Sequence, residues 1–142
     1  MIAGGRGEVV VQDEEEQEVI RMAAMALVVL DSSGLTEDGD WMSFVYDDGL
    51  GQEARGILVR WNGELFAFRN LCPHWSTPLD RHGDDLVDPA TGDLVCQTHG
   101  ARFEIHTGRC VLGPCQGDTL QRLTVHVDDT GQATIRRGSL LF

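Results

Sequence analysis

Apolar and polar residues alternate in short runs along most of the chain, and this pattern predicts an all-β protein. The runs are separated by turns rich in glycine, asparagine and aspartate. Many short strands divided by such turns are typical of an antiparallel sandwich or a small barrel. The predicted strands cover residues 27–30, 41–46, 56–61, 64–69, 94–96, 102–105, 123–127 and 133–136.

Two places in this pattern are informative about local structure. Asn62 and Gly63 stand between two of the predicted strands, and both residue types accept the positive φ angles of a two-residue hairpin turn. The pair therefore predicts a β-hairpin. The apolar stretch 19–30 is less uniform, because residues 22–26 favour a helix while the β-branched residues after them favour a strand.

The composition predicts one acidic globular domain. Of 142 residues, 42% are hydrophobic, and 23 acidic residues against 11 basic ones give a net charge of −12. That charge disfavours general nucleic-acid binding and contact with anionic membranes. All the basic residues are arginine, which excludes a phosphate loop with its lysine and Schiff-base chemistry. The longest apolar run has nine residues, against about 20 for a membrane span, so we expect a cytoplasmic protein.

The charge is unevenly distributed along the chain. Residues 1–18 hold six acids and one base, a composition that predicts a disordered tail. Residues 19–142 show no linker and are predicted to form one domain. Residues Asp84, Asp85 and Asp88 are interpreted as a solvated loop, with docking of a basic redox partner as the alternative.

Two segments combine cysteine with histidine at short spacing. The first contains Cys72-x-His74 and the second contains Cys96-x-x-His99. Four such side chains on two tight loops predict a four-ligand metal site. A structural zinc site is one alternative, but its loops commonly take two ligands of one kind at wider spacing. Ligands separated by one residue suit two neighbouring irons better, as in a [2Fe–2S] centre in which two histidines replace two cysteines.

These segments resemble the Rieske [2Fe–2S] fingerprint, with a proline inside the first pair and a glycine after the last histidine. The resemblance extends from about residue 56 to residue 127 and includes the run Gly113-Pro114. It implies an all-β Rieske fold, with an antiparallel sandwich or barrel base and a small cluster-binding lobe at about 71–114. It also implies Cys72 and Cys96 on the inner iron, and His74 and His99 on the outer iron.

Charge arithmetic gives this ligand set a function. Two ferric ions, two sulfides, two thiolates and two neutral imidazoles sum to zero, so one added electron gives −1. An all-cysteine cluster would pass from −2 to −3, and reduction is easier from the less negative state. The resemblance therefore implies a one-electron carrier, ferredoxin-like, between a flavin-dependent reductase and a terminal oxygenase. A small subunit of a larger oxidoreductase, such as nitrite reductase, is the alternative, and a structural zinc domain is a further one.

The residues around the ligands indicate the oxygenase-associated type. The respiratory type has two further cysteines, at the positions held here by Thr77 and Thr98, and it has hydroxyl residues where this chain has Ala101 and Phe103. Without hydroxyl groups to hydrogen-bond the sulfurs, the reduction potential is predicted to lie at the low end of the Rieske range. The remaining pair, Cys110 and Cys115, is interpreted as two small apolar residues in a buried turn, with a redox pair or extra ligands as the alternative.

Overall fold

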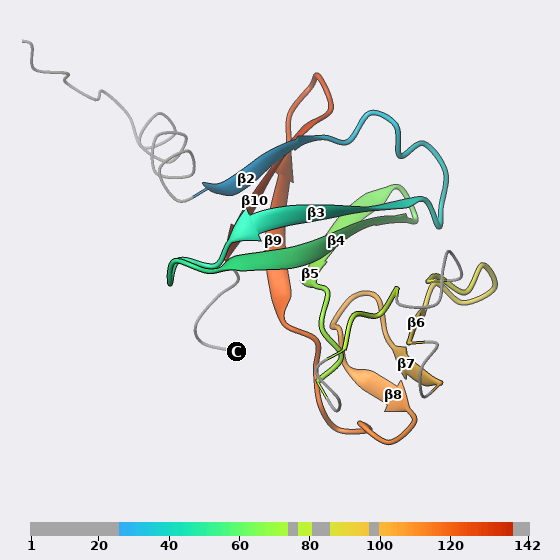
Figure 1. Cartoon of the computed structure of the whole chain (residues 1–142). Coiled ribbons are helices and arrows are strands. Elements are labelled where there is room, and N and C mark those ends of the chain that lie inside the picture. Colours follow the sequence, from blue (N-terminus) through green and yellow to red (C-terminus); the bar gives the residue numbers. More distant parts are fainter. Residues whose placement is uncertain (1–25, 74–76, 81–85, 97–99, 138–142) are drawn as a thin grey trace, which may run out of the picture.

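The computed structural model describes residues 26–73, 77–80, 86–96 and 100–137, which form strands and no helix (Figure 1). This confirms the all-β prediction. Within these ranges no helix is long and apolar enough to cross a membrane. The strands are β2 (Ala26–Asp31), β3 (Trp41–Asp47), β4 (Glu53–Trp61), β5 (Glu64–Arg69), β6 (Leu94–Cys96), β7 (Ala101–Phe103), β8 (Cys110–Leu112), β9 (Arg122–Val127) and β10 (Gln132–Arg137).

Six of these strands form the larger sheet, in the order β2-β10-β9-β5-β4-β3, and all the neighbours are antiparallel. The two edge strands, β2 and β3, also approach each other, so the sheet curls into a nearly closed barrel. The predicted barrel base is therefore confirmed. Ala26 begins β2, so the helix considered for residues 22–26 does not include its last residue, and residues 22–25 lie outside the described ranges.

The hairpin between β4 and β5 forms where the sequence predicts it. Trp61 pairs with Glu64, and the two turn residues between them, Asn62 and Gly63, have φ angles of 53° and 78°. Both angles lie in the left-handed region that a two-residue hairpin turn requires. The turn fixes the register of β4 against β5, and β5 leads directly into the first cysteine-containing segment.

The smaller sheet has three strands in the order β6-β7-β8 and lies beside one end of the barrel (Figure 1). The predicted strand at 102–105 is shorter than expected and ends at Phe103, because Glu104 closes a turn. Its carboxylate accepts hydrogen bonds from the backbone N–H groups of His106 and Thr107, at 3.0 Å each. Strand β8 was not predicted from the sequence.

The central strand β4 is buried on both faces, and this connects the barrel to the smaller sheet. Successive side chains of a strand point to opposite faces. Leu58 packs inside the barrel with Ile135, whereas Ile57 and Val59 pack into a second core that includes the residues of the smaller sheet. Trp41 and Trp61 are half-buried and pack against this second core.

Candidate metal centre

The two cysteines of the predicted ligand set come together in the second core. Cys72 follows β5 and is 1% exposed, and Cys96 ends β6 and is fully buried. Both belong to the same apolar cluster, with Leu79 and Phe103 among its other members. His74 and His99 lie outside the described residues. The structure thus brings two thiols from separate loops into one dry region.

The first loop is closed at its base by Asn70, which sequence reasoning did not single out. This side chain is 4% exposed. Its Oδ1 accepts a hydrogen bond of 2.7 Å from the backbone N–H of Leu79, and its Nδ2 donates one of 2.9 Å to Asp80. The N–H of Cys72 also donates to the carbonyl of Thr77 at 2.8 Å. The chain is therefore held on both sides of position 74.

The second loop is held by the ladder between β6 and β7. Cys96 pairs with Ala101, and the N–H of Gly100 donates to the Cys96 carbonyl at 2.8 Å. These contacts join the residues on either side of positions 97–99. The loop therefore begins and ends on one short antiparallel pair.

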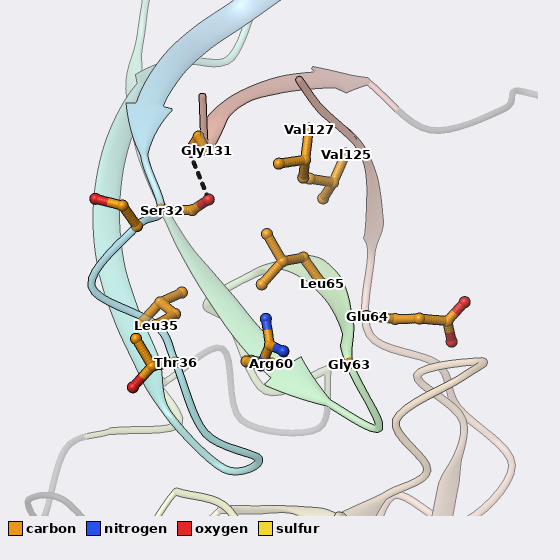
Figure 2. Close-up of a pocket in the computed structure, with 11 residues that line it drawn as sticks. Ser32, Leu35, Thr36, Arg60, Gly63, Glu64, Leu65, Val125, Val127 and Gly131 are labelled. Atoms are coloured by element: carbon orange, nitrogen blue, oxygen red, sulfur yellow. Dashed lines mark hydrogen bonds between the residues drawn. The ribbon is translucent and has the colours of Figure 1, made fainter. Parts of the chain in front are cut away.

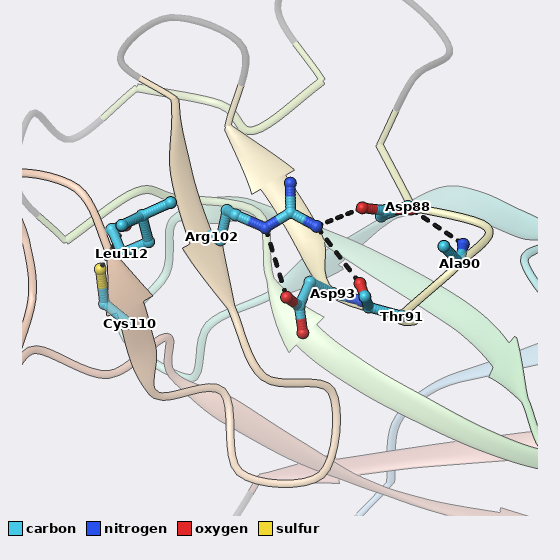
Figure 3. Close-up of polar contacts among 7 residues, drawn as sticks. All are labelled: Asp88, Ala90, Thr91, Asp93, Arg102, Cys110 and Leu112. Atoms are coloured by element: carbon cyan, nitrogen blue, oxygen red, sulfur yellow. Dashed lines mark hydrogen bonds and ion pairs between the residues drawn. The ribbon is translucent and has the colours of Figure 1, made fainter.

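Arg102 anchors this hairpin to the turn at 88–93 (Figure 3). Its guanidinium forms an ion pair with Asp88 and donates to Asp93 at 3.3 Å and to Thr91 at 3.2 Å. The turn is closed by the N–H of Asp88, which donates to the Asp93 carbonyl at 2.9 Å. Arg102, which the sequence did not mark as important, thus connects two segments that flank the second ligand loop.

The backbone N–H of Ala90, together with the Arg102 guanidinium, lowers the pKa of the Asp88 carboxyl below its ordinary value. A carboxylate that accepts hydrogen bonds and pairs with a cation is favoured over its protonated form. Asp88 is therefore charged at neutral pH and occupied by contacts within the chain. Asp84 and Asp85, the other members of the acidic run, lie outside the described residues.

The residues after β8, 113–117, form a third loop that packs onto β7. Gly113 has a φ of 109°, and a Cβ atom placed on it would lie 2.8 Å from the Cα of Ala101. Only glycine allows this close approach of two backbones. Cys110 begins β8 and Cys115 lies in this loop, and their side chains are 2% and 1% exposed. The prediction that both are buried is confirmed.

A cavity of about 620 Å³ lies elsewhere, on the barrel (Figure 2). Its lining includes Ser32, Arg60, Leu65 and Val125. None of the lining residues comes from the loops that carry the four cysteines. This cavity is therefore separate from the candidate metal centre.

Comparison with known proteins identifies the family. Residues 8–127 match the Rieske [2Fe–2S] domain. The chain belongs to the Rieske [2Fe–2S] domain family. A Rieske domain binds one [2Fe–2S] cluster and transfers electrons, which confirms the cofactor predicted from the Cys-x-His and Cys-x-x-His pairs.

Solved structures with this Rieske fold include ferredoxins. A ferredoxin from Sphingomonas yanoikuyae B1 is 26% identical, with a TM-score of 0.60 over 79% of this chain and 99% of that one. The ferredoxin of carbazole 1,9a-dioxygenase from Nocardioides aromaticivorans IC177 is 23% identical, with a TM-score of 0.59 over 80% and 96%. A protein from Mycobacterium tuberculosis, assigned as an NADH-dependent nitrite reductase small subunit, is 14% identical, with a TM-score of 0.60 over 80% and 96%. No curated protein matches the chain by sequence.

The described residues fit a Rieske cluster in their chemistry. Cys72 and Cys96 are two buried cysteines in an apolar region, and sulfur is the donor that the inner iron of a Rieske cluster takes. The hydroxyl of Thr77, on the first loop, is buried and has no hydrogen-bond partner among the described residues. Among the described residues no group of three or more histidine, cysteine, aspartate or glutamate side chains could hold a metal ion. A complete ligand set therefore needs residues beyond the described ranges.

The other histidines in the described ranges lie away from the cysteines. His106 is exposed, its Nδ1 lies 2.7 Å from the Glu104 carboxylate, and its ring packs edge-on against Phe66. His126 is exposed on β9. His82 lies outside the described residues.

We expect the replacement of Asn70 by alanine to lower the free energy of unfolding by about 1–3 kcal/mol, because the buried N–H of Leu79 loses its acceptor. Chemical denaturation measures this. Asn70→Asp is the matched variant, since it keeps an acceptor for Leu79 but faces Asp80 with a second carboxylate. It should also lose stability at pH 7, because two carboxylates in contact repel each other. Wild-type stability of Asn70→Ala would show that the loop is held without this side chain.

The contribution of Asp88 to stability should depend on pH in one direction. A lowered pKa in the folded state stabilises the protein above the ordinary aspartate value of about 3.9, and this contribution disappears as the pH falls through the folded-state pKa. The stability difference between wild type and Asp88→Asn should therefore be full at pH 7 and vanish in acid. Asp129→Asn, in the exposed turn after β9, is the control. A difference that stays constant down to pH 2 would contradict the assignment.

Proposed function

We propose that this Rieske protein carries one electron at a time from a flavin-dependent reductase to a terminal oxygenase. In this proposal Cys72 and Cys96 bind the inner iron of the cluster, and His74 and His99 bind the outer iron. The observation that carries the ligand assignment is the burial of both thiols in one apolar cluster. Each of them begins a loop that continues to one of the two histidines.

The chain's own residues would prepare this site in three ways. Cys72 and Cys96 would supply two thiolates in a region from which Leu79 and Phe103, both fully buried, exclude water. Asn70 and the β6–β7 ladder would keep the loops fixed, so little rearrangement accompanies a change of charge. The cluster, when bound, would accept and release a single electron at the side of the molecule where the ligand loops lie.

The side chains after the second ligand pair favour a low potential. Ala101 and Phe103 are both fully buried in β7, and neither has a hydroxyl group that could donate to a sulfur. Hydrogen bonds to the sulfurs stabilise the reduced, more negative cluster. Their absence at these two positions supports a potential toward the lower limit of the Rieske range, about −150 mV.

The partners are proposed from the likeness to ferredoxins, one of which serves a dioxygenase. The alternative role, a small subunit of a nitrite reductase, is supported by the similar fold of the mycobacterial protein. The acidic residue Asp88 is engaged with Arg102, so it contributes less free charge to a docking surface than the sequence suggested. The two roles differ in whether the chain leaves its partner.

The purified protein should contain two irons and two sulfides per chain. We expect a reddish-brown colour that bleaches with dithionite and a rhombic low-temperature EPR signal of the reduced form. His74→Cys and His99→Cys should each lower the midpoint potential if the cluster is retained, because an added thiolate makes the site more negative. His126→Cys, exposed on β9, is the matched control and should leave the potential unchanged.

Two outcomes would contradict this assignment. A colourless protein with one zinc per chain would replace the electron carrier with a structural metal domain. An unchanged potential in His74→Cys or His99→Cys, with full iron content, would remove that histidine from the ligand set. Measuring iron, sulfide and zinc in each preparation separates these cases.

Isolation from native cells should distinguish a mobile electron carrier from a permanent subunit. We expect the untagged protein to be recovered without stoichiometric partner chains at moderate ionic strength, because a shuttle has to leave its donor to reach its acceptor. Quantitative mass spectrometry of the purified fractions measures the ratio of chains. Recovery in a fixed ratio with one large oxidoreductase chain would instead favour the subunit role.

A further inference from the structure

Cys110 and Cys115 lie closer together than their roles as small apolar residues require. Their sulfur atoms are 2.8 Å apart, and both side chains are almost fully buried. The Sγ of Cys110 also lies 3.3 Å from the carbonyl oxygen of Leu112, to which it can donate (Figure 3). Two thiols at this distance need to approach by less than about 1 Å to reach the disulfide bond length of about 2.05 Å.

The backbone holds this pair in place through one shared neighbour. The N–H of Cys110 donates to the carbonyl of Asp118 at 2.8 Å, and the N–H of Asp118 donates to the carbonyl of Cys115 at 2.8 Å. Both cysteines are thus anchored to the same residue on the far side of the turn. The short distance between the sulfurs follows from these backbone contacts of the third loop.

We propose that Cys110 and Cys115 are a redox-active dithiol, which a small disulfide such as oxidised glutathione converts to an intrachain disulfide. One cysteine attacks the glutathione disulfide and forms a mixed disulfide, which releases one reduced glutathione. The second cysteine then attacks the mixed disulfide and releases the other. In total two thiols lose two protons and two electrons, one S–S bond forms in the chain, and one oxidised glutathione becomes two reduced glutathiones.

The surroundings of the pair make its oxidation to the disulfide slow but do not prevent it. Both thiols are almost fully buried, so a small disulfide cannot reach them in the closed structure. The segment between the cysteines is at the surface, with Val111 and Leu112 of β8 44% and 55% exposed. Local opening of this segment is therefore the expected route for the oxidant.

Oxidation of the pair should also affect the cluster, and this part rests on the proposed function. Cys72, proposed as an iron ligand, belongs to the same buried cluster as Cys115, and each side chain is 1% exposed. The Cys115 thiol has one proton, which it donates here to the Cys110 sulfur, and rotation of the S–H bond would direct this proton toward the Cys72 sulfur. In the disulfide this proton is absent. Since hydrogen bonds to cluster sulfurs stabilise the reduced form, the disulfide form should have the lower midpoint potential.

The sequence allows a direct count of the thiols. Trypsin cleaves after Arg109 and Arg122, so Cys110 and Cys115 fall in one peptide, while Cys72 and Cys96 fall in two others. The full-length protein with its cluster is equilibrated without oxygen in buffers of increasing oxidised-to-reduced glutathione ratio. Acid quenching, alkylation with N-ethylmaleimide and mass spectrometry follow. We expect peptide 110–122 to become two hydrogens lighter and to lose both adducts, while Cys72 and Cys96 stay alkylated.

Two results would overturn the dithiol. One is a peptide 110–122 that stays doubly alkylated in the most oxidising buffer, in which the guanidinium-unfolded chain does form the bond. The other is a disulfide between Cys115 and Cys72, which would mean that the wrong pair was assigned. Cys110→Ser and Cys115→Ser serve as controls that cannot form the bond, and their iron content shows whether they fold.

The effect on the cluster has its own measurement. The midpoint potential should fall when the pair is oxidised, and Cys115→Ala should reproduce this lower value in the reduced protein. Cys110→Ala, which leaves the Cys115 thiol beside Cys72, is the matched control and should keep the wild-type potential. Equal potentials in the thiol and disulfide forms would overturn the coupling. A protein without iron would overturn the proposed function and leave the thiol count unaffected.

Discussion

Two thiols that lie 24 positions apart in the chain have to reach one buried space, and most of the second core serves this requirement. Neither loop could bury its cysteine alone. Strand β4 makes the space possible because its side chains are buried on both faces: Leu58 completes the barrel, while Ile57 and Val59 cover the cysteines' side. The three-stranded sheet can therefore be small, because the barrel strand β4 supplies part of the core that covers it.

The loops themselves are held by polar contacts at their bases, and these contacts differ in how much they contribute. Asn70 is buried, so the loss of its hydrogen bonds leaves groups that water cannot reach. Arg102 and Asp88 are each about a quarter exposed, so solvent weakens their attraction and the pair mainly fixes geometry. A site that changes charge by one electron benefits from both. Rigid loops limit rearrangement, and in the part of the chain that the structure describes no charged side chain is buried.

Much of this arrangement is predictable from local sequence, and the exceptions are the features that depend on distant contacts. The Asn62–Gly63 hairpin and the paired Cys/His motifs are local signals, because a few neighbouring residues determine both the backbone preference and the ligand spacing. Strand β8 has three residues and exists only because β7 lies beside it. The clamp by Asn70 likewise depends on Leu79 reaching it, and a single asparagine in the sequence does not indicate such a contact. The contact between Cys110 and Cys115 follows from the shape of the third loop, which their spacing of five does not determine.

The third loop is important because β7 has no hydroxyl side chain at the positions that face the cysteines. Ala101 and Phe103 present no hydroxyl toward the cysteines, so hydrogen-bond donors near the sulfurs have to come from elsewhere. Gly113 allows the third loop to rest directly on Ala101, and this contact brings the Cys115 side chain into the core that contains Cys72. A hydroxyl is a permanent donor, whereas a thiol loses its proton when it forms a disulfide. When a thiol takes the place of the hydroxyl, the hydrogen bonding around the cluster sulfurs depends on the oxidation state of the surroundings.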